Sequence, residues 1–369
     1  MNTQIVDTIN PLVPLLQKLE YHTTIKNDIL VPSGHIRYNG FTGLLEIAES
    51  EYKISEFTHS QIAGKLEIPF AYYKKMKTDF PALLESNING WLSRKENVKY
   101  LLRTFNYKEE GVQNLCRAML SDRYAILDNY DVLLACLEAV KKMGVNVEIQ
   151  KADVTENKMY LRIVCPEVQI QAEELLKGYL QNQDQYGVGN GIMSGIIISN
   201  SETGSGGFEV SPSSCILKCL NGLVDRSNRY RRIHLGAKMD EGTISWSKNT
   251  KNKNFELVIS QISDAIKTFL SKEYLGQTVK KLEAAKGILL EHPTAVIEHV
   301  STALGISDTH KADILRHFIH DNEYSALGVF HAVTRTSQSM DPDARFETES
   351  SIFEMLPSLK RFDHPISKN

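Results

Sequence analysis

The chain has 369 residues, of which 42% are hydrophobic and 24% are charged, and its formal net charge is −3. These values are ordinary for globular proteins, so they exclude global disorder, and the length favours two or three packed units over one. No run of 18 or more apolar residues occurs in the sequence, so a membrane-spanning helix is not expected. The small net charge alone gives no indication of a nucleic-acid partner.

The first residues and the cysteines bear on the cellular compartment. Residues 1–7 contain no cationic start followed by an apolar block, so a secretory signal is not expected. The cysteines are odd in number and thinly spread: Cys116, Cys136, Cys165, Cys215 and Cys219. This usage argues against a disulfide framework and favours a reducing, cytoplasmic location.

Residues 1–100 are predicted to form a mostly helical region. A short helical pattern covers residues 12–19, and prolines and glycines between residues 32 and 40 then indicate a loop-rich stretch. Residues 57–78 predict two helices separated by a turn at Ile68-Pro69, with Thr58 as the N-cap of the first helix.

The spacing in residues 57–78 is typical of a helix-turn-helix unit, and a weaker copy of it covers residues 297–318. In DNA-binding proteins the second helix of such a unit enters the major groove. Many helical hairpins have the same spacing without touching DNA, so a purely structural role is the alternative.

The middle of the chain predicts a mixed fold. A helix at residues 132–142 ends at Gly144, and three strands follow at residues 145–150, 158–164 and 192–199. A second helix is expected at residues 213–223, after Pro212. Because the strands are joined through short turns, we predict an α+β fold: an antiparallel sheet of three or more strands, with helices packed on one face.

The last third of the chain predicts helices. Residues 255–290 repeat their apolar positions at helical spacing, and the helical pattern continues to about residue 336. We therefore expect three parts: an N-terminal helical region at 1–100, an α+β core at 101–253 and a C-terminal helical region at 254–369.

A basic span at residues 216–253 is the strongest physical signal in the sequence. It contains nine cationic and three acidic residues, within a chain that is acidic overall. Concentrated positive charge is what recognition of phosphates requires. The predicted nucleic-acid-binding residues are Lys218, Arg226, Arg229, Tyr230, Arg231, Arg232, Lys238, Trp246, Lys248, Lys251 and Lys253, with Arg103, Arg117 and Arg123 as secondary candidates.

Tyr230 and Trp246 lie among these cations, and aromatic rings among cations suit the stacking of unpaired bases. The alternative interpretation is a solvated loop whose cations form local ion pairs. Arg123 has a similar alternative, because it can form a buried structural pair with Asp122 or Asp128.

Other sequence patterns give weaker evidence for a functional site. The glycines at 187–191 lack the lysine that ends a phosphate-binding loop, and Cys215 and Cys219, expected on one helix face, lack partners for zinc. His310, His317, His320 and His331 accompany no metalloprotease motif, so no metal or cofactor is predicted. The carboxylates and lysine at 153–158 resemble those of a metal-dependent nuclease, but polar turns also favour these residues.

Five blocks of sequence carry a family resemblance. They are Leu101-Leu102-Arg103-Thr104; Arg117-Ala118-Met119-Leu120-Ser121-Asp122-Arg123-Tyr124 with Leu127-Asp128-Asn129; Lys218-Cys219-Leu220-Asn221-Gly222; Ala332-Val333-Thr334-Arg335; and Arg345-Phe346-Glu347-Thr348-Glu349. Over residues 40–355 the chain resembles the phage/plasmid-like family defined by domain of unknown function nine-three-two. The resemblance implies a mobile-element origin, in a bacterial host cell, and supplies no catalytic residues. The family pattern leads us to expect a residue with a side-chain amide at position 331, whereas this chain has His331.

The predicted order of helix, three strands and helix is also similar to the core of single-strand annealing proteins, a likeness of topology alone. We therefore expect a non-enzymatic nucleic-acid-binding protein that acts on DNA, single-stranded rather than duplex, as a homo-oligomer. Two alternatives remain open. One is a protein-interaction module, such as an inhibitor of a host defence enzyme, and the other is a metal-dependent nuclease.

Overall fold

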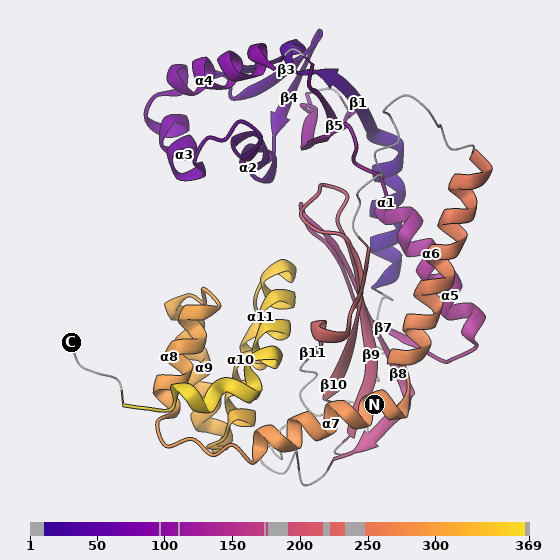
Figure 1. Cartoon of the computed structure of the whole chain (residues 1–369), viewed down its shortest axis with the longest axis vertical. Helices are drawn as coiled ribbons and strands as arrows, with labels where there is room; N and C mark the ends of the chain where they lie inside the picture. Colours follow the sequence, from indigo (N-terminus) through magenta and orange to yellow (C-terminus); the bar gives the residue numbers. More distant parts are fainter. Residues whose placement is uncertain are drawn as a thin grey trace, which may run out of the picture.

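The computed structural model describes residues 11–95, 97–109, 111–172, 175, 191–216, 222–232 and 248–365. Two six-stranded sheets organise this part of the chain. Figure 1 shows that the chain curves like a letter C, with the first sheet and its helices in one arm, the second sheet in the middle and the last helices in the other arm. No helix of the described ranges is long and apolar enough to cross a membrane.

The N-terminal module is built on the first sheet. Its strands are β1 (Lys26–Pro32), β2 (Ile36–Asn39), β3 (Leu44–Ile47), β4 (Ser50–Ile54), β5 (Lys99–Phe105) and β6 (Leu115–Ser121), in the order β1-β5-β6-β4-β3-β2. Neighbouring strands are antiparallel, except β4 and β6. Because β1 pairs with β5, this module extends to residue 121 rather than to residue 100, and its sheet was not expected from the sequence.

Three helices cover the N-terminal sheet: α2 (Glu56–Lys65), α3 (Phe70–Asp79) and α4 (Pro81–Arg94). Their apolar faces meet in one core, in which Ile62, Tyr73 and Ile88 are fully buried beside Leu102 of β5. The two predicted helices at 57–78 are therefore confirmed as α2 and α3. The N-cap of α2 is Ser55 rather than Thr58, because the Ser55 hydroxyl accepts a hydrogen bond from the Thr58 amide.

The second sheet forms the middle of the molecule and follows α5 (Asn129–Met143), which ends at Gly144 with φ of 66°. Its strands are β7 (Glu148–Val154), β8 (Met159–Gln171), β9 (Gly191–Asn200), β10 (Phe208–Ile216), β11 (Gly222–Val224) and β12 (Tyr230–Arg232). The order is β11-β10-β9-β8-β7, with β12 also paired to β10, and every pair is antiparallel. The predicted antiparallel sheet is confirmed.

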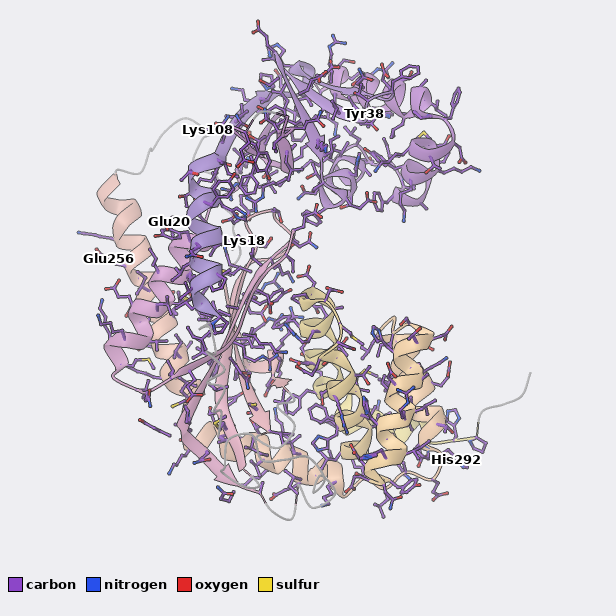
Figure 2. All side chains as sticks on the ribbon, turned by 180° about the vertical axis from the view of Figure 1, so that it is seen from behind. Lys18, Glu20, Tyr38, Lys108, Glu256 and His292 are labelled. Atoms are coloured by element: carbon purple, nitrogen blue, oxygen red, sulfur yellow. The ribbon has the colours of Figure 1, made fainter. Side chains whose placement is uncertain are left out.

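Three helices pack on one face of this central sheet, as the predicted α+β class requires: α1 (Leu12–Ile25), α5 and α6 (Lys248–Phe269). Leu19 of α1, Cys136 of α5 and Ile266 of α6 are buried against Leu161 and Ile198 of the strands. Lys18 of α1 also donates to the Val154 carbonyl at 3.4 Å. Figure 2 shows Lys18 and Glu20 on α1, and Glu256 on α6.

The C-terminal helices follow α6: α7 (Lys272–Lys286), α8 (Pro293–Ala303), α9 (Asp308–Asp321), α10 (Ala326–Ser337) and α11 (Pro342–Met355). Their core includes Leu282, Val300 and Phe330, and it extends to Ile192 and Ile216 at one end of the central sheet. In Figure 1, α11 lies against the sheet face opposite α5 and α6. The predicted C-terminal helical region is confirmed.

The prediction of a helix at residues 213–223 is wrong. Residues up to Ile216 belong to β10, and Gly222 begins β11, while residues 217–221 lie outside the described ranges. Strand β10 is buried along its whole length because both faces of the sheet are covered. Residues 208–211 alternate between apolar and polar, but residues 213–216 do not, so the periodicity at 213–216 did not indicate a strand. Cys215 therefore lies in a strand and not on a helix face.

Candidate nucleic-acid interface

The first two arginines of the basic span are already paired with carboxylates. Arg226, in the short helix Arg226–Asn228, places its Nε 3.1 Å from Glu209 and an Nη atom 2.8 Å from Glu347. The Nε of Arg229 lies 3.5 Å from the same Glu209. Glu209 and Glu347 therefore already pair with both guanidinium groups, as the alternative of local ion pairs predicts, and nucleic-acid binding by Arg226 and Arg229 stays a prediction.

The aromatic residue of this run is also engaged. Tyr230 donates its hydroxyl hydrogen bond to Gln261 of α6 at 3.0 Å, and its ring packs edge-on against Phe208 at 6.4 Å. Tyr230, which is partly buried, therefore anchors β12 to α6. Among the cations of the basic span whose side chains the structure describes, Arg231 and Lys253 are exposed and form no ion pair with other described residues.

The remaining residues of the basic span cannot be placed. Lys218, Lys238 and Trp246 lie outside the described residues, and so do the side chains of Arg232, Lys248 and Lys251. The glycines at 187–190 lie outside them as well.

Arg103 is not a surface cation, although it was a secondary candidate. Its side chain is 1% exposed, and its guanidinium contacts Asp28 at 2.9 Å and Asp128 at 2.6 Å. Burial raises the pKa of Asp128, but Arg103 and Lys26 outweigh burial and hold that pKa below its ordinary value. The buried pair expected between Arg123 and Asp128 is thus made by Arg103, while Arg123 is exposed.

Arg117 is buried as well, in a contact between the two sheets. An Nη atom lies 2.9 Å from Glu202, and the guanidinium is 4.1 Å from the centre of the Phe105 ring. The other carboxylate oxygen of Glu202 accepts from the Asn129 amide at 2.6 Å, at the start of α5. Glu202 therefore joins β6 of the first sheet to α5 of the central module, and Arg117 is a structural residue.

Four of the five sequence blocks behind the family resemblance contribute to two such contacts, while Arg335 of the block at 332–335 pairs with Asp321 instead. Arg103, Arg117 and Asp128 gather around the segment that carries Glu202, as described above. At the second contact, Arg162 of β8 pairs with Glu349 of α11, and a Cβ added at Gly222 would lie 1.6 Å from the Arg162 guanidinium. These blocks therefore hold the three parts of the chain together.

A narrow polar pocket also separates the central sheet from α11. It is lined by Lys151, Tyr160, Arg162 and Arg345, among others. Burial and the two nearby guanidinium groups lower the pKa of Lys151 to about 8. Arg345 pairs with Asp153 at 2.7 Å, and Tyr160 donates to Asp343 at 2.8 Å, so most charges here are balanced inside the protein.

Two pairs of helices share one turn geometry. Between α2 and α3, Glu67 has φ of 58°, and the Ile68 amide donates to the Ala63 carbonyl at 2.9 Å. Between α8 and α9, Gly305 has φ of 63°, and the Ile306 amide donates to Ser301 at 2.8 Å. In both pairs four residues separate the helices, so both predicted helix-turn-helix units have the expected local structure.

The two units differ in the charge of their second helices. On α3, Tyr72, Lys74 and Lys75 are exposed, and Tyr72 is 50% accessible. Neither Lys74 nor Lys75 forms an ion pair within the described ranges, although Lys77 pairs with Glu56 at 3.4 Å. On α9, by contrast, the cations are neutralised locally: Lys311 pairs with Asp308 and Glu298, and Arg316 pairs with Asp313.

The geometry does not support metal binding or nuclease activity at the residues that were considered for these roles. In the hairpin at 153–158, Asp153 pairs with Arg345, and Lys158 lies 3.6 Å from Glu347. His331 is buried in α10, while His310, His317 and His320 lie on α9. Among the residues that the structure describes, no three His, Cys, Asp or Glu side chains are grouped so that they could hold a metal ion.

The chain was compared with protein-family models, with curated proteins and with solved structures, and none of the three comparisons gives a match. The resemblance to the phage/plasmid-like family therefore stays a prediction from the five sequence blocks.

Proposed function

We propose that the chain is a non-enzymatic nucleic-acid-binding protein and that α3 makes the first contact with the nucleic acid. The observation that carries the proposal is the outer face of α3, where Lys74 and Lys75 are exposed in the second helix of a helix-turn-helix unit. Lysines without carboxylate partners are free to neutralise phosphates and release counterions. The arginines that are buried or paired cannot do so without breaking an internal contact.

The central module supports the same class of function by analogy. The second helix of this analogy was expected at residues 213–223, where the described residues form strands; α6, later in the chain, packs beside α5 on one face of the antiparallel sheet instead. The proposal therefore includes DNA of a mobile element as substrate, acted on during recombination, with a homo-oligomer as the working form. Arg231 and Lys253, which are exposed, extend the candidate surface beyond α3.

The test is a fluorescence anisotropy titration of labelled single-stranded and duplex oligonucleotides at several salt concentrations. The variant Lys74→Ala/Lys75→Ala removes the proposed contact. Its matched control is Lys141→Ala/Lys142→Ala, which removes two adjacent exposed lysines from α5. We expect the α3 variant to bind about tenfold or more weakly and to lose roughly one unit of salt slope per phosphate contact.

The control should bind like the unmodified chain, with the same melting temperature for all three proteins. Equal affinity of the two double variants would show that α3 makes no contact with the nucleic acid. A further variant, Arg231→Ala/Lys253→Ala, measures what the described end of the basic span contributes.

A protein-binding function is the second candidate, favoured by exposed apolar side chains in the C-terminal module. Leu289 and Ile319 are 68% and 67% accessible, and Tyr324 is 51% accessible. Leu289 forms a β-bridge with Ser325, next to Tyr324. If the chain binds no oligonucleotide at low salt, replacement of Leu289 and Ile319 by Ser should be tested against capture of a stoichiometric protein partner.

A further inference from the structure

We propose that α4 carries a stacking site for an unpaired nucleobase, centred on Trp91, so that the bound nucleic acid is single-stranded. This inference rests on the proposed nucleic-acid-binding function, and it names the class of substrate. The site is an open hollow of about 260 Å³ along one face of α4. Its lining residues are Ser86, Asn87, Gly90, Trp91 and Arg94.

The helix itself brings these residues together. Residues three and four apart in an α-helix lie on the same face, so Asn87, Gly90, Trp91 and Arg94 form one continuous stripe. Trp91 is 46% exposed, which leaves much of its large ring open to solvent. A Cβ added at Gly90 would meet no atom within 4 Å, so the space beside the ring is open.

The chemistry of the stripe matches that of a nucleotide. The Trp91 ring offers a flat surface that stacks on any base, and the Arg94 guanidinium lies over one face of that ring, 6.0 Å from its centre, from where it can reach a phosphate of a base stacked on the other face. Both hydrogen bonds of the Asn87 amide, to Leu83 and to Met76, use its nitrogen. Its oxygen therefore remains as an acceptor for an N–H group of the base.

The hollow on α4 lies in the same module as the lysines of α3. The Asn87 nitrogen lies 3.7 Å from the Met76 sulfur, so the stripe on α4 adjoins α3, and Figure 1 shows the two helices in the same arm of the molecule. A strand held at its phosphates by Lys74 and Lys75 has Trp91 within the same module. Bases in a duplex already stack on one another, so only an unpaired base can occupy the Trp91 ring.

The chain offers a direct reporter, because its only tryptophans are Trp91 and Trp246. In the variant Trp246→Phe, all tryptophan emission comes from Trp91. This variant is titrated with an oligothymidylate and with a duplex of equal length, while anisotropy of a labelled strand records binding independently. We expect quenching of Trp91 emission by the single strand, saturating with the anisotropy signal, and no quenching by the duplex.

Affinity provides the second measurement and does not depend on Trp246→Phe folding. In the otherwise unmodified chain, Trp91→Ala should weaken binding of the single strand at least about fivefold, since one stacked base contributes a factor of roughly 5 to 150. Trp91→Phe should restore part of the loss, because phenylalanine keeps a smaller ring. The matched control is Phe41→Ala, which removes another exposed aromatic side chain, 91% accessible, from the N-terminal module.

The outcomes separate the two proposals. Binding without Trp91 quenching, or with equal affinity for Trp91→Ala and Phe41→Ala, overturns the stacking site and leaves the nucleic-acid-binding function standing. Quenching by the duplex as well as the single strand also overturns the stacking site. Absence of any binding by the unmodified chain at low salt overturns both proposals.

Discussion

Arg162 of β8 and Glu349 of α11 form a buried ion pair between the central sheet and the last helix, with side chains 8% and 0% exposed. Neither charge can find water if its partner is removed. Replacing Glu349 by Ala should therefore lower the free energy of unfolding by about 3–5 kcal/mol, measured by urea denaturation. Glu354→Ala, which removes an exposed carboxylate from the same helix, should change stability by less than about 0.5 kcal/mol. Equal effects of the two variants would contradict the assignment.

Gly222 leaves room for the Arg162 side chain of the same ion pair. A methyl group there would overlap the Arg162 guanidinium, whose nearest atom lies 1.6 Å from the ideal Cβ. Gly222→Ala should therefore destabilise the protein by a few kcal/mol, while Gly64→Ala, in the last turn of α2 where an added Cβ meets no atom, should stabilise it by about 0.4–1 kcal/mol. Because both changes act through Arg162, Gly222→Ala and Glu349→Ala combined should cost less than the sum of their separate effects. If the two losses of stability simply add, the effect of Gly222→Ala does not act through Arg162.

Lys151 should make stability depend on alkaline pH. Its pKa is about 8 in the folded chain and 10.5 ordinarily, because burial and the guanidinium groups of Arg345 and Arg162 disfavour its charge. Between these values the unfolded chain holds a proton that the folded chain has lost, so stability from Lys151 rises as pH increases from 8 to 10.5. Thermal unfolding at several pH values should show that Lys151→Met lacks this gain. If stability changes with pH in the same way in the unmodified chain and in Lys151→Met, Lys151 is not the cause of the pH dependence.

His59 should make the N-terminal module sensitive to acid. The ring nitrogen Nδ1 lies 2.8 Å from the Tyr73 hydroxyl, and burial, with Lys77 nearby, lowers the pKa of His59 to about 4. The unfolded chain binds this proton near pH 6.5, so stability is lost as pH falls from 6.5 to 4. The variant His59→Phe/Tyr73→Phe should lose less stability over that range in chemical denaturation. A loss equal to that of the unmodified chain would contradict this account.

The sequence was sufficient for the α+β class, the antiparallel sheet after α5 and the two helix-turn-helix units, because each depends on local periodicity and turn residues. It failed for residues 213–223, because the strand-like alternation of residues 208–211 does not continue at 213–216, although β10 is buried along its whole length. The first sheet was missed as well. Its strands are four to seven residues long, and β1 meets its partner β5 only after three helices.

The candidate site shows the same limit. The cations could be counted in the sequence, but their partners could not be found, since Glu347 lies 121 residues from Arg226 and Asp28 lies 75 residues from Arg103. Lys74 and Lys75 belonged to a predicted helix and were not selected, because the sequence does not show which lysines lack a neighbouring carboxylate. Trp91 could have drawn notice as one of two tryptophans, but its exposure depends on how α4 packs.

The position of α1 has a consequence for biosynthesis. Leu19 is buried in the same core as Ile266, about 250 residues later in the chain, whereas the N-terminal sheet is complete at Ser121. At about 5–20 residues per second, the ribosome needs on the order of 10–50 s to add the intervening chain. The sheet of residues 26–121 can therefore close early, whereas the core around the first helix is complete only after α6 has been translated, even though α5 and β7, which contact α1, come earlier in the chain.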